Sequence, residues 1–138
     1  MNSSRMKLTL LRYVLMIDAA VLILLGVFFL LTPKHIESAF HFPDLPAAVD
    51  YLIALWGCVF LTLGFGYVIA ATNPLKHVVW VQMGIARGAL ELLLGLVYLG
   101  RGVILWQQAA FGIVVAALVA IAYLVLYPRR VSQPAPAV

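Results

Sequence analysis

The chain has 138 residues, of which 65% are hydrophobic and only 10% are charged. Soluble domains carry about 25% charged residues, and a soluble fold of this length could not bury so much apolar surface, which excludes a soluble globular protein. The net charge of +4 is not gathered into a basic run interleaved with aromatic residues, so we expect no nucleic-acid partner. The expected fold class is all-α, a polytopic membrane protein whose first partner is the lipid bilayer.

Four apolar segments are long enough to cross a bilayer, which requires about 20 residues of helix. They cover residues 13–31, 48–71, 77–99 and 104–127. Breaks formed by Pro, Gly and Asn follow them, at Thr32-Pro33, Asn73-Pro74, Gly100-Arg101-Gly102 and Pro128. The sequence therefore predicts a four-helix antiparallel transmembrane bundle over 13–127. A polar cytoplasmic lead over 1–12 precedes it, and a cytoplasmic tail over 128–138 follows it.

Residues 32–47 form the one sizeable loop, between the first and second predicted spans. Pro33 is suited to the first position of a helix, so we expect a short helix over 33–40, held at the membrane surface by Phe40 and Phe42. Four potential metal ligands crowd this loop: His35, Glu37, His41 and Asp44. Their spacing matches no metal motif, so a solvated polar loop is the preferred interpretation and a metal site is the alternative.

The Lys and Arg residues at the ends of the spans predict the orientation of the bundle, because cytoplasmic loops carry an excess of positive charge. Six of them lie at one end: Arg5, Lys7, Arg12, Lys76, Arg129 and Arg130. Two lie at the other end: Lys34 and Arg101. We therefore expect both termini in the cytoplasm. The aromatic residues expected near the span ends, typical of a membrane interface, are Tyr13, Tyr51, Tyr67, Trp80, Trp106, Tyr123 and Tyr127.

Small residues recur at helical spacing along three of the spans, and such stripes permit close packing of helices. The candidate packing residues are Gly57, Gly64, Gly84, Gly88, Gly95, Gly112, Ala116 and Ala120. Because three of these glycines fall within 77–99, we expect that segment at the centre of the bundle. The tight turn at Asn73-Pro74 predicts that the second and third spans pack as neighbours. The stripes exceed what one small bundle needs, which favours packing against other membrane proteins.

Three ionisable residues lie within the spans: Asp18, Arg87 and Glu91. A charge at the bilayer centre costs roughly 2.5–3.5 kcal/mol on insertion scales, so such residues are paired or functional. Arg87 and Glu91 are four apart and share one helical face. At 1.5 Å per residue, Asp18 lies about 10 Å and Arg87 about 15 Å from the same membrane face, an offset that an arginine can bridge. The sequence therefore predicts an intramembrane charge cluster, provided that the first and third spans meet.

Two interpretations of this cluster stay open. In the structural interpretation, Arg87 neutralises the carboxylates and fixes the packing of the helices. In the functional interpretation, the cluster is a proton or cation site, or the anchor for the head group of a ligand. The sequence does not distinguish them, because both require the same residues.

The sequence contains no Gly-rich phosphate loop, no G-x-S-x-G and no H-E-x-x-H motif. We therefore expect no catalytic residue, no cofactor and no metal. Cys58, the only cysteine, excludes an internal disulfide and is expected to be a small packing residue.

The preferred function is a non-enzymatic accessory or assembly subunit that packs against other membrane proteins, in a homo-oligomer or a larger complex. The alternative is a small oligomeric proton-coupled transporter that uses Asp18, Arg87 and Glu91. A membrane enzyme that acts on a lipid or a quinone is the third hypothesis.

Residues 64–77, GFGYVIAATNPLKH, resemble a pattern found in small bacterial four-helix membrane proteins of the DoxX-like and domain-of-unknown-function kind. In those proteins a G-Y-x-x-A-A-x-[ND]-P-x-[RK]-H run ends the second helix and opens the third. The resemblance implies a four-helix protein of the bacterial inner membrane. It implies no catalytic residue for this chain.

Overall fold

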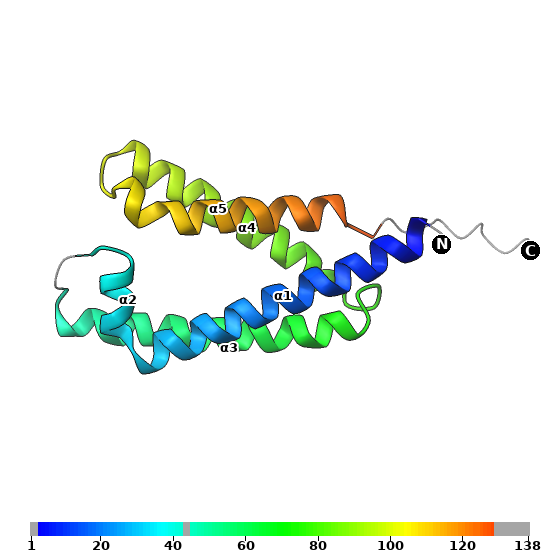
Figure 1. Cartoon of the computed structure of the whole chain (residues 1–138), viewed down its shortest axis with the longest axis horizontal. Coiled ribbons are helices and arrows are strands. Elements are labelled where there is room, and N and C mark those ends of the chain that lie inside the picture. Colours follow the sequence, from blue (N-terminus) through cyan, green and yellow to red (C-terminus); the bar gives the residue numbers. More distant parts are fainter. Residues whose placement is uncertain (1–2, 43–44, 129–138) are drawn as a thin grey trace, which may run out of the picture.

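The computed structural model describes residues 3–42 and 45–128, in which helices are joined by short turns and loops (Figure 1). The helices are α1 (Ser3–Leu31), α2 (Pro33–Ala39), α3 (Ala47–Thr72), α4 (Val78–Gly100) and α5 (Trp106–Val125). The four long helices are long and apolar enough to cross a membrane, which confirms the predicted all-α fold with four spans. Three residues named in the sequence analysis lie outside the described residues: Asp44, Arg129 and Arg130.

The helix bounds follow the predicted spans closely, except at the start of α1. That helix begins at Ser3, so it continues through most of the segment expected to be a polar lead. No Pro or Gly interrupts this segment, and Leu11 within it is fully buried. Pro33 opens α2 as expected, while the Thr32 hydroxyl donates back to the Phe28 carbonyl at 3.0 Å instead of capping the helix.

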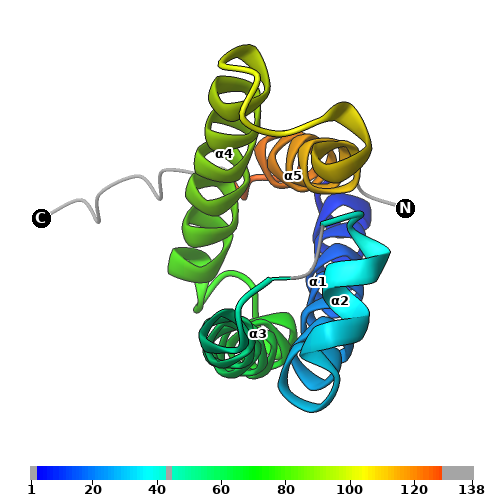
Figure 2. The same cartoon turned by 90° about the vertical axis from the view of Figure 1, so that its left-hand side faces the viewer.

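The long helices pack in two antiparallel pairs, α1 with α3 and α4 with α5, and the pairs diverge from one end of the molecule (Figures 1 and 2). Glycines bring the backbones of α1 and α3 together. A Cβ atom at Gly57 would lie 2.7 Å from the Gly26 carbonyl oxygen, and one at Gly64 would lie 3.2 Å from the Ala19 carbonyl oxygen. Side chains at these positions would force this pair apart.

The α4–α5 pair uses small residues in the same way. A Cβ atom at Gly88 would lie 2.8 Å from the Ala116 carbonyl oxygen and 3.0 Å from the Ala120 Cβ. Gly84 lies against the ring of Tyr123, and Gly95 lies against Ile113. Gly112 makes no such contact, because no atom of the described residues lies within 4 Å of the position that its Cβ would take.

Three expectations about packing are wrong. α4 is not central: it packs on α5, and no Cα atom of α1 lies within 8 Å of one in α4. α3 and α4 are not close neighbours along their lengths, although Trp80 packs against Gly66 and Tyr67 near the turn between them. A tight turn joins two helix ends but does not determine the angle between the helices. Cys58 is exposed and does not pack in the interior.

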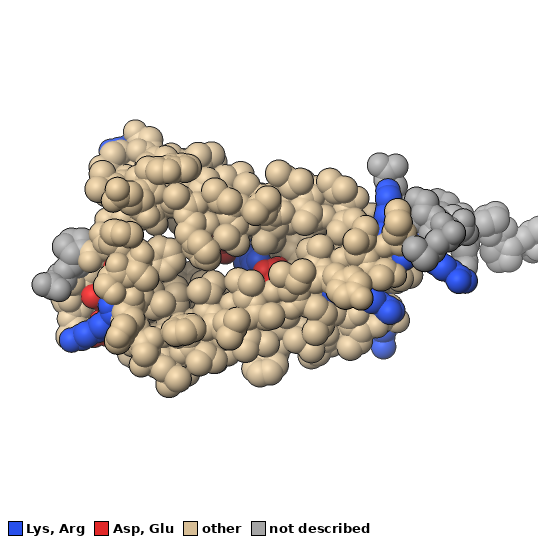
Figure 3. Space-filling view, viewed as in Figure 1, with Lys and Arg blue, Asp and Glu red and all other residues tan. Residues whose placement is uncertain are grey.

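The core lies where the two pairs converge and draws side chains from all four long helices. Its buried members are Leu11, Leu15, Ala19, Leu22, Tyr67, Ala70, Ala71, Val81 and Tyr123. Large apolar side chains cover the outer surface of the helices, as a lipid environment requires. On the face seen in Figure 3, charged side chains gather at the two ends and in a hollow between the pairs.

Candidate intramembrane site

Asp18 is the centre of a polar cluster where the two helix pairs approach each other. Its side chain is only 6% exposed. Arg87 of α4 donates from Nη2 to both carboxylate oxygens, at 2.8 Å to Oδ1 and 3.0 Å to Oδ2. The Tyr123 hydroxyl of α5 donates to Oδ2 at 2.8 Å. These donors come from α4 and α5, so the carboxylate links both helices to α1. Hydrogen bonds to an ionised group are stronger than those between neutral groups, which makes this a strong link.

Aromatic rings hold the donors of Asp18 in place. The Tyr123 ring stacks on the Tyr67 ring of α3, with centroids 6.1 Å apart and an interplanar angle of 17°. The Cζ atom of Arg87 lies 5.4 Å from the centroid of the same Tyr67 ring, within reach of a cation–π interaction. Gly84 leaves room for the Tyr123 ring beside α4. All four long helices therefore contribute to one polar cluster.

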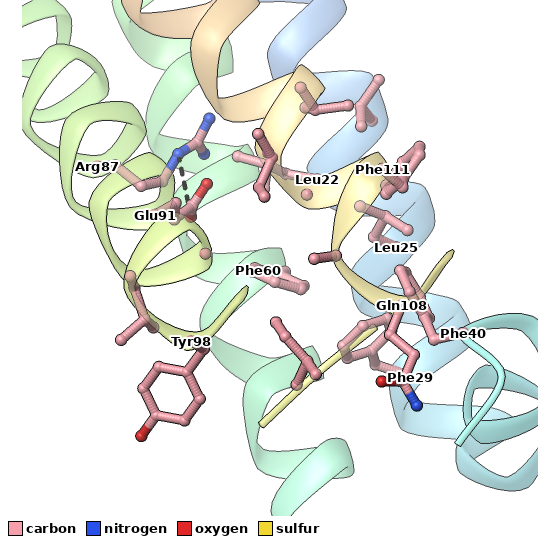
Figure 4. A pocket seen from close by; sticks show the side chains of 18 of the residues that line it. Leu22, Leu25, Phe29, Phe40, Phe60, Arg87, Glu91, Tyr98, Gln108 and Phe111 are labelled. Carbon is pink, nitrogen blue, oxygen red and sulfur yellow. Dashed lines mark ion pairs between the residues drawn. The ribbon is translucent and has the colours of Figure 1, made fainter. Parts of the chain in front are cut away.

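Glu91 lies one helical turn beyond Arg87 and is held differently. The Arg87 Nε atom lies 3.8 Å from the Glu91 Oε1 atom, which is too long for a hydrogen bond (Figure 4). The Glu91 side chain is 47% exposed. The short hydrogen bonds of Arg87 thus go to Asp18, and Glu91 keeps an exposed carboxyl group.

A cavity of about 410 Å³ lies between the two helix pairs, and Asp18, Arg87 and Glu91 line one part of it (Figure 4). Most of its other lining residues are apolar, among them Leu22, Leu25, Phe29, Phe60, Leu94 and Ile113. Phe40, Tyr98 and Gln108 line it near the end at which the pairs diverge. This arrangement of apolar walls with a few polar groups is typical of small-molecule sites.

The loop after α2 bounds the wide end of this cavity. The Gln108 side chain donates from Nε2 to the His41 carbonyl at 3.1 Å, which ties this loop to the start of α5. His41 has a φ of 59°, in the left-handed region, at the turn that follows α2. Among residues 3–42 and 45–128, no three His, Cys, Asp or Glu side chains converge as metal ligands would.

Glu37 is not the solvated residue that was expected. Its side chain is buried against α3 and lines a second apolar cavity with Phe29 and Val49. Burial raises the pKa of Glu37, and the neighbouring carboxyl of Asp50 acts in the same direction. Glu37 Oε1 and Asp50 Oδ1 are both buried and have no hydrogen-bond partner among the described residues. The expectation of a solvated polar loop is therefore wrong at Glu37.

Tyr67, Tyr123 and Gln108 are site residues that sequence reasoning missed. The two tyrosines were expected to be ordinary interfacial residues, yet both are fully buried. A signal for Tyr123 was present, because it continues the helical face marked by Ala116 and Ala120. No comparable signal marked Gln108, whose partner is the backbone of a distant loop.

No protein-family model, no curated protein and no solved structure matches the chain. The assignment to a class of protein therefore depends on the helices themselves. Four of them have the length and apolar composition needed to cross a bilayer, and they pack in two pairs. The chain is an integral membrane protein with four membrane-spanning helices.

Proposed function

We propose that the chain is a small proton-coupled transporter that works as an oligomer. The observation that carries the proposal is the position of Glu91, whose half-exposed carboxyl group faces an apolar cavity between the helix pairs. Ionisable groups that face a cavity inside a membrane protein are functional candidates. In this proposal Glu91 binds and releases the proton, while Asp18, Arg87 and Tyr123 position the helices around it.

The division into two helix pairs supports this proposal. Alternating access requires one body to rock or slide against another around a fixed site. Here the α1–α3 pair and the α4–α5 pair meet where Arg87 and Tyr123 hold Asp18, and they diverge beyond that point. A change in the angle between the pairs would open or close the cavity. Four helices rarely enclose a pathway, so a second copy would complete the walls.

Proteoliposomes test the transport proposal. The purified chain is reconstituted with a pH-sensitive dye inside, and a panel of amphiphilic compounds is added outside. We expect proton movement driven by at least one compound, its loss in Glu91→Gln, and its retention in Glu37→Gln, a matched change outside this cavity. Folded wild-type protein that moves no protons with any compound would contradict the proposal.

A non-enzymatic accessory or assembly subunit is the second candidate. The incompletely closed bundle favours it, because a partner helix could pack between the two pairs. The surplus of small residues supports it less, since Gly57, Gly64 and Gly88 are in contact within the chain. Native mass spectrometry after gentle solubilisation separates the candidates: a defined complex with another membrane protein supports this one, and a homo-oligomer supports the transporter. A strictly monomeric species would count against both.

We further propose that the chain lies in a bacterial inner membrane with both termini in the cytoplasm. The resemblance of residues 64–77 to small DoxX-like bacterial proteins supports the choice of membrane. The described cations near the converging end outnumber those near the diverging end, which supports the orientation. Those near the converging end are Arg5, Lys7, Arg12 and Lys76. Those near the diverging end are Lys34 and Arg101.

A further inference from the structure

We infer that the cavity between the helix pairs binds a monovalent organic cation with an apolar body, whose charge pairs with Glu91. The inference names the substrate class of the proposed transporter and in that respect rests on the proposed function. Three features of the cavity carry it: the balance of charge beside it, the composition of its walls, and its volume.

The charges beside the cavity do not balance. Asp18 and Glu91 contribute two carboxyl groups, and Arg87 contributes one guanidinium group. Both short hydrogen bonds of Arg87 go to Asp18, while its nearest distance to Glu91 is 3.8 Å. An ionised carboxylate in apolar surroundings is costly unless it is paired. One further positive charge is therefore needed to neutralise the Glu91 carboxylate, and a proton or a bound cation can supply it.

Within residues 3–42 and 45–128, no group other than Arg87 brings a positive charge to Glu91. The titratable side chains that approach it from the neighbouring helices are Asp18 of α1 and Tyr67 of α3. On its own helix, α4, Tyr98 lines the same cavity. A tyrosine hydroxyl group carries no positive charge. Because a proton and an organic cation satisfy the same carboxylate, binding of one displaces the other.

The walls select an organic cation over an inorganic one. Phe29, Phe60, Tyr98 and Phe111 place aromatic rings around the cavity, and the faces of such rings attract cations. Apolar side chains cannot replace the oxygen ligands that a hydrated metal ion gives up on binding. The volume of about 410 Å³ is within the range of sites that hold small organic molecules.

Calorimetric titration with tetraphenylphosphonium tests the inference on the full chain in lipid nanodiscs. We expect saturable binding by the wild type that weakens as the pH falls, because protons compete for Glu91. Glu91→Gln should weaken binding by at least about tenfold, the loss that corresponds to one modest ionic interaction. Triphenylphosphine oxide, a neutral compound of similar aromatic character, should bind more weakly than the cation.

Control variants separate a lost site from a disturbed fold. Glu37→Gln makes the same chemical change outside this cavity and should leave cation binding unchanged. Gly112→Leu adds a side chain to a cavity-lining position where none of the described residues comes within 4 Å of the Cβ, so it should fold and block binding. Gly100→Leu is the matched change at another open glycine, one that does not line the cavity, and should bind normally.

Each outcome decides the inference. Unchanged affinity in Glu91→Gln, equal affinity for the neutral compound, or no binding by folded wild-type protein would overturn it. Cation binding that depends on Glu91, with no transport in proteoliposomes, would support the inference and contradict the proposed function. Proton-coupled transport of other compounds, with no cation binding, would support the function and overturn the inference.

Discussion

Arg87 donates to both carboxylate oxygens of Asp18, although no Cα atom of α1 lies within 8 Å of one in α4. Helices α1 and α4 are therefore joined by side chains and not by close backbone packing. Tyr123 adds a third helix to the same carboxylate. A bridge of this kind holds two bodies together while leaving space beside it, and the cavity occupies that space.

The first prediction concerns the bridge itself. Arg87→Ala leaves the buried Asp18 carboxylate without a counter-charge, and breaking one partner of a buried pair typically costs about 3–5 kcal/mol. Removing Asp18 as well should restore part of this loss, with a coupling of roughly 0.5–3 kcal/mol between the two changes. Unfolding of the single and double variants in detergent measures the coupling. Strict additivity would show that the two residues do not interact.

The second prediction compares two glycines that face different surroundings. Gly88→Leu places a side chain against the Ala116 carbonyl and should destabilise the α4–α5 pair by about 1–3 kcal/mol through overpacking. Gly112→Leu makes the same change where nothing lies nearby, and leucine favours a helix over glycine by roughly 0.5–1 kcal/mol. Gly88→Leu should therefore unfold at a clearly lower temperature than Gly112→Leu. Equal stability of the two variants would mean that α4 and α5 do not pack through Gly88.

The third prediction concerns pH and α2. Burial raises the pKa of Glu37 above its ordinary value in the folded protein, so folding favours its protonated form. The resulting stability is fully present below the ordinary pKa and is lost as the pH rises through the raised pKa of the folded state. Hydrogen exchange should show stronger protection of α2 in acid. The same measurement on Glu37→Gln should show this dependence abolished, and its persistence would assign the effect to another group.

The fourth prediction concerns orientation. Lys34 and Lys76 are both exposed and lie at opposite ends of the helices, so they provide a matched pair for cysteine labelling. In a Cys58→Ser background, Lys34→Cys should react with a membrane-impermeant reagent added outside the cell. Lys76→Cys should react with the same reagent only after the membrane is permeabilised. The reverse pattern would place the termini outside and contradict the proposed topology.

The spans could be predicted from the sequence because their signals are local: long apolar runs, bounded by Pro33, Asn73-Pro74 and the glycines around Arg101. The depths of Asp18 and Arg87 along their spans made a contact feasible if the first and third spans meet. The structure places Arg87 Nη2 2.8 Å from Asp18 Oδ1, although α1 and α4 do not pack on each other. Depth is a one-dimensional property of a helix, so it can be calculated from residue number.

The arrangement of the pairs could not be predicted in the same way. It depends on which faces of four apolar helices meet, and small residues occur on several of them. The tight turn at Asn73-Pro74 suggested close packing of α3 and α4, the helices on either side of it. Instead, α3 packs mainly on α1 and α4 packs mainly on α5. The cavity arises from this choice of partners, so its existence and its Gln108–His41 closure were not accessible from the sequence.

The central claim is that Asp18 holds the helix pairs together, while Glu91 binds the proton or the organic cation in the cavity. The most direct test compares the thermal unfolding of Asp18→Asn and Glu91→Gln, since each change removes a charge and nearly preserves the shape of the side chain. Asp18→Asn should unfold at a clearly lower temperature, because it leaves the guanidinium group of Arg87 buried without its partner. Glu91→Gln should stay within about 0.5 kcal/mol of the wild type, as expected for an exposed group. A loss of stability in Glu91→Gln as large as that in Asp18→Asn would contradict the division of roles.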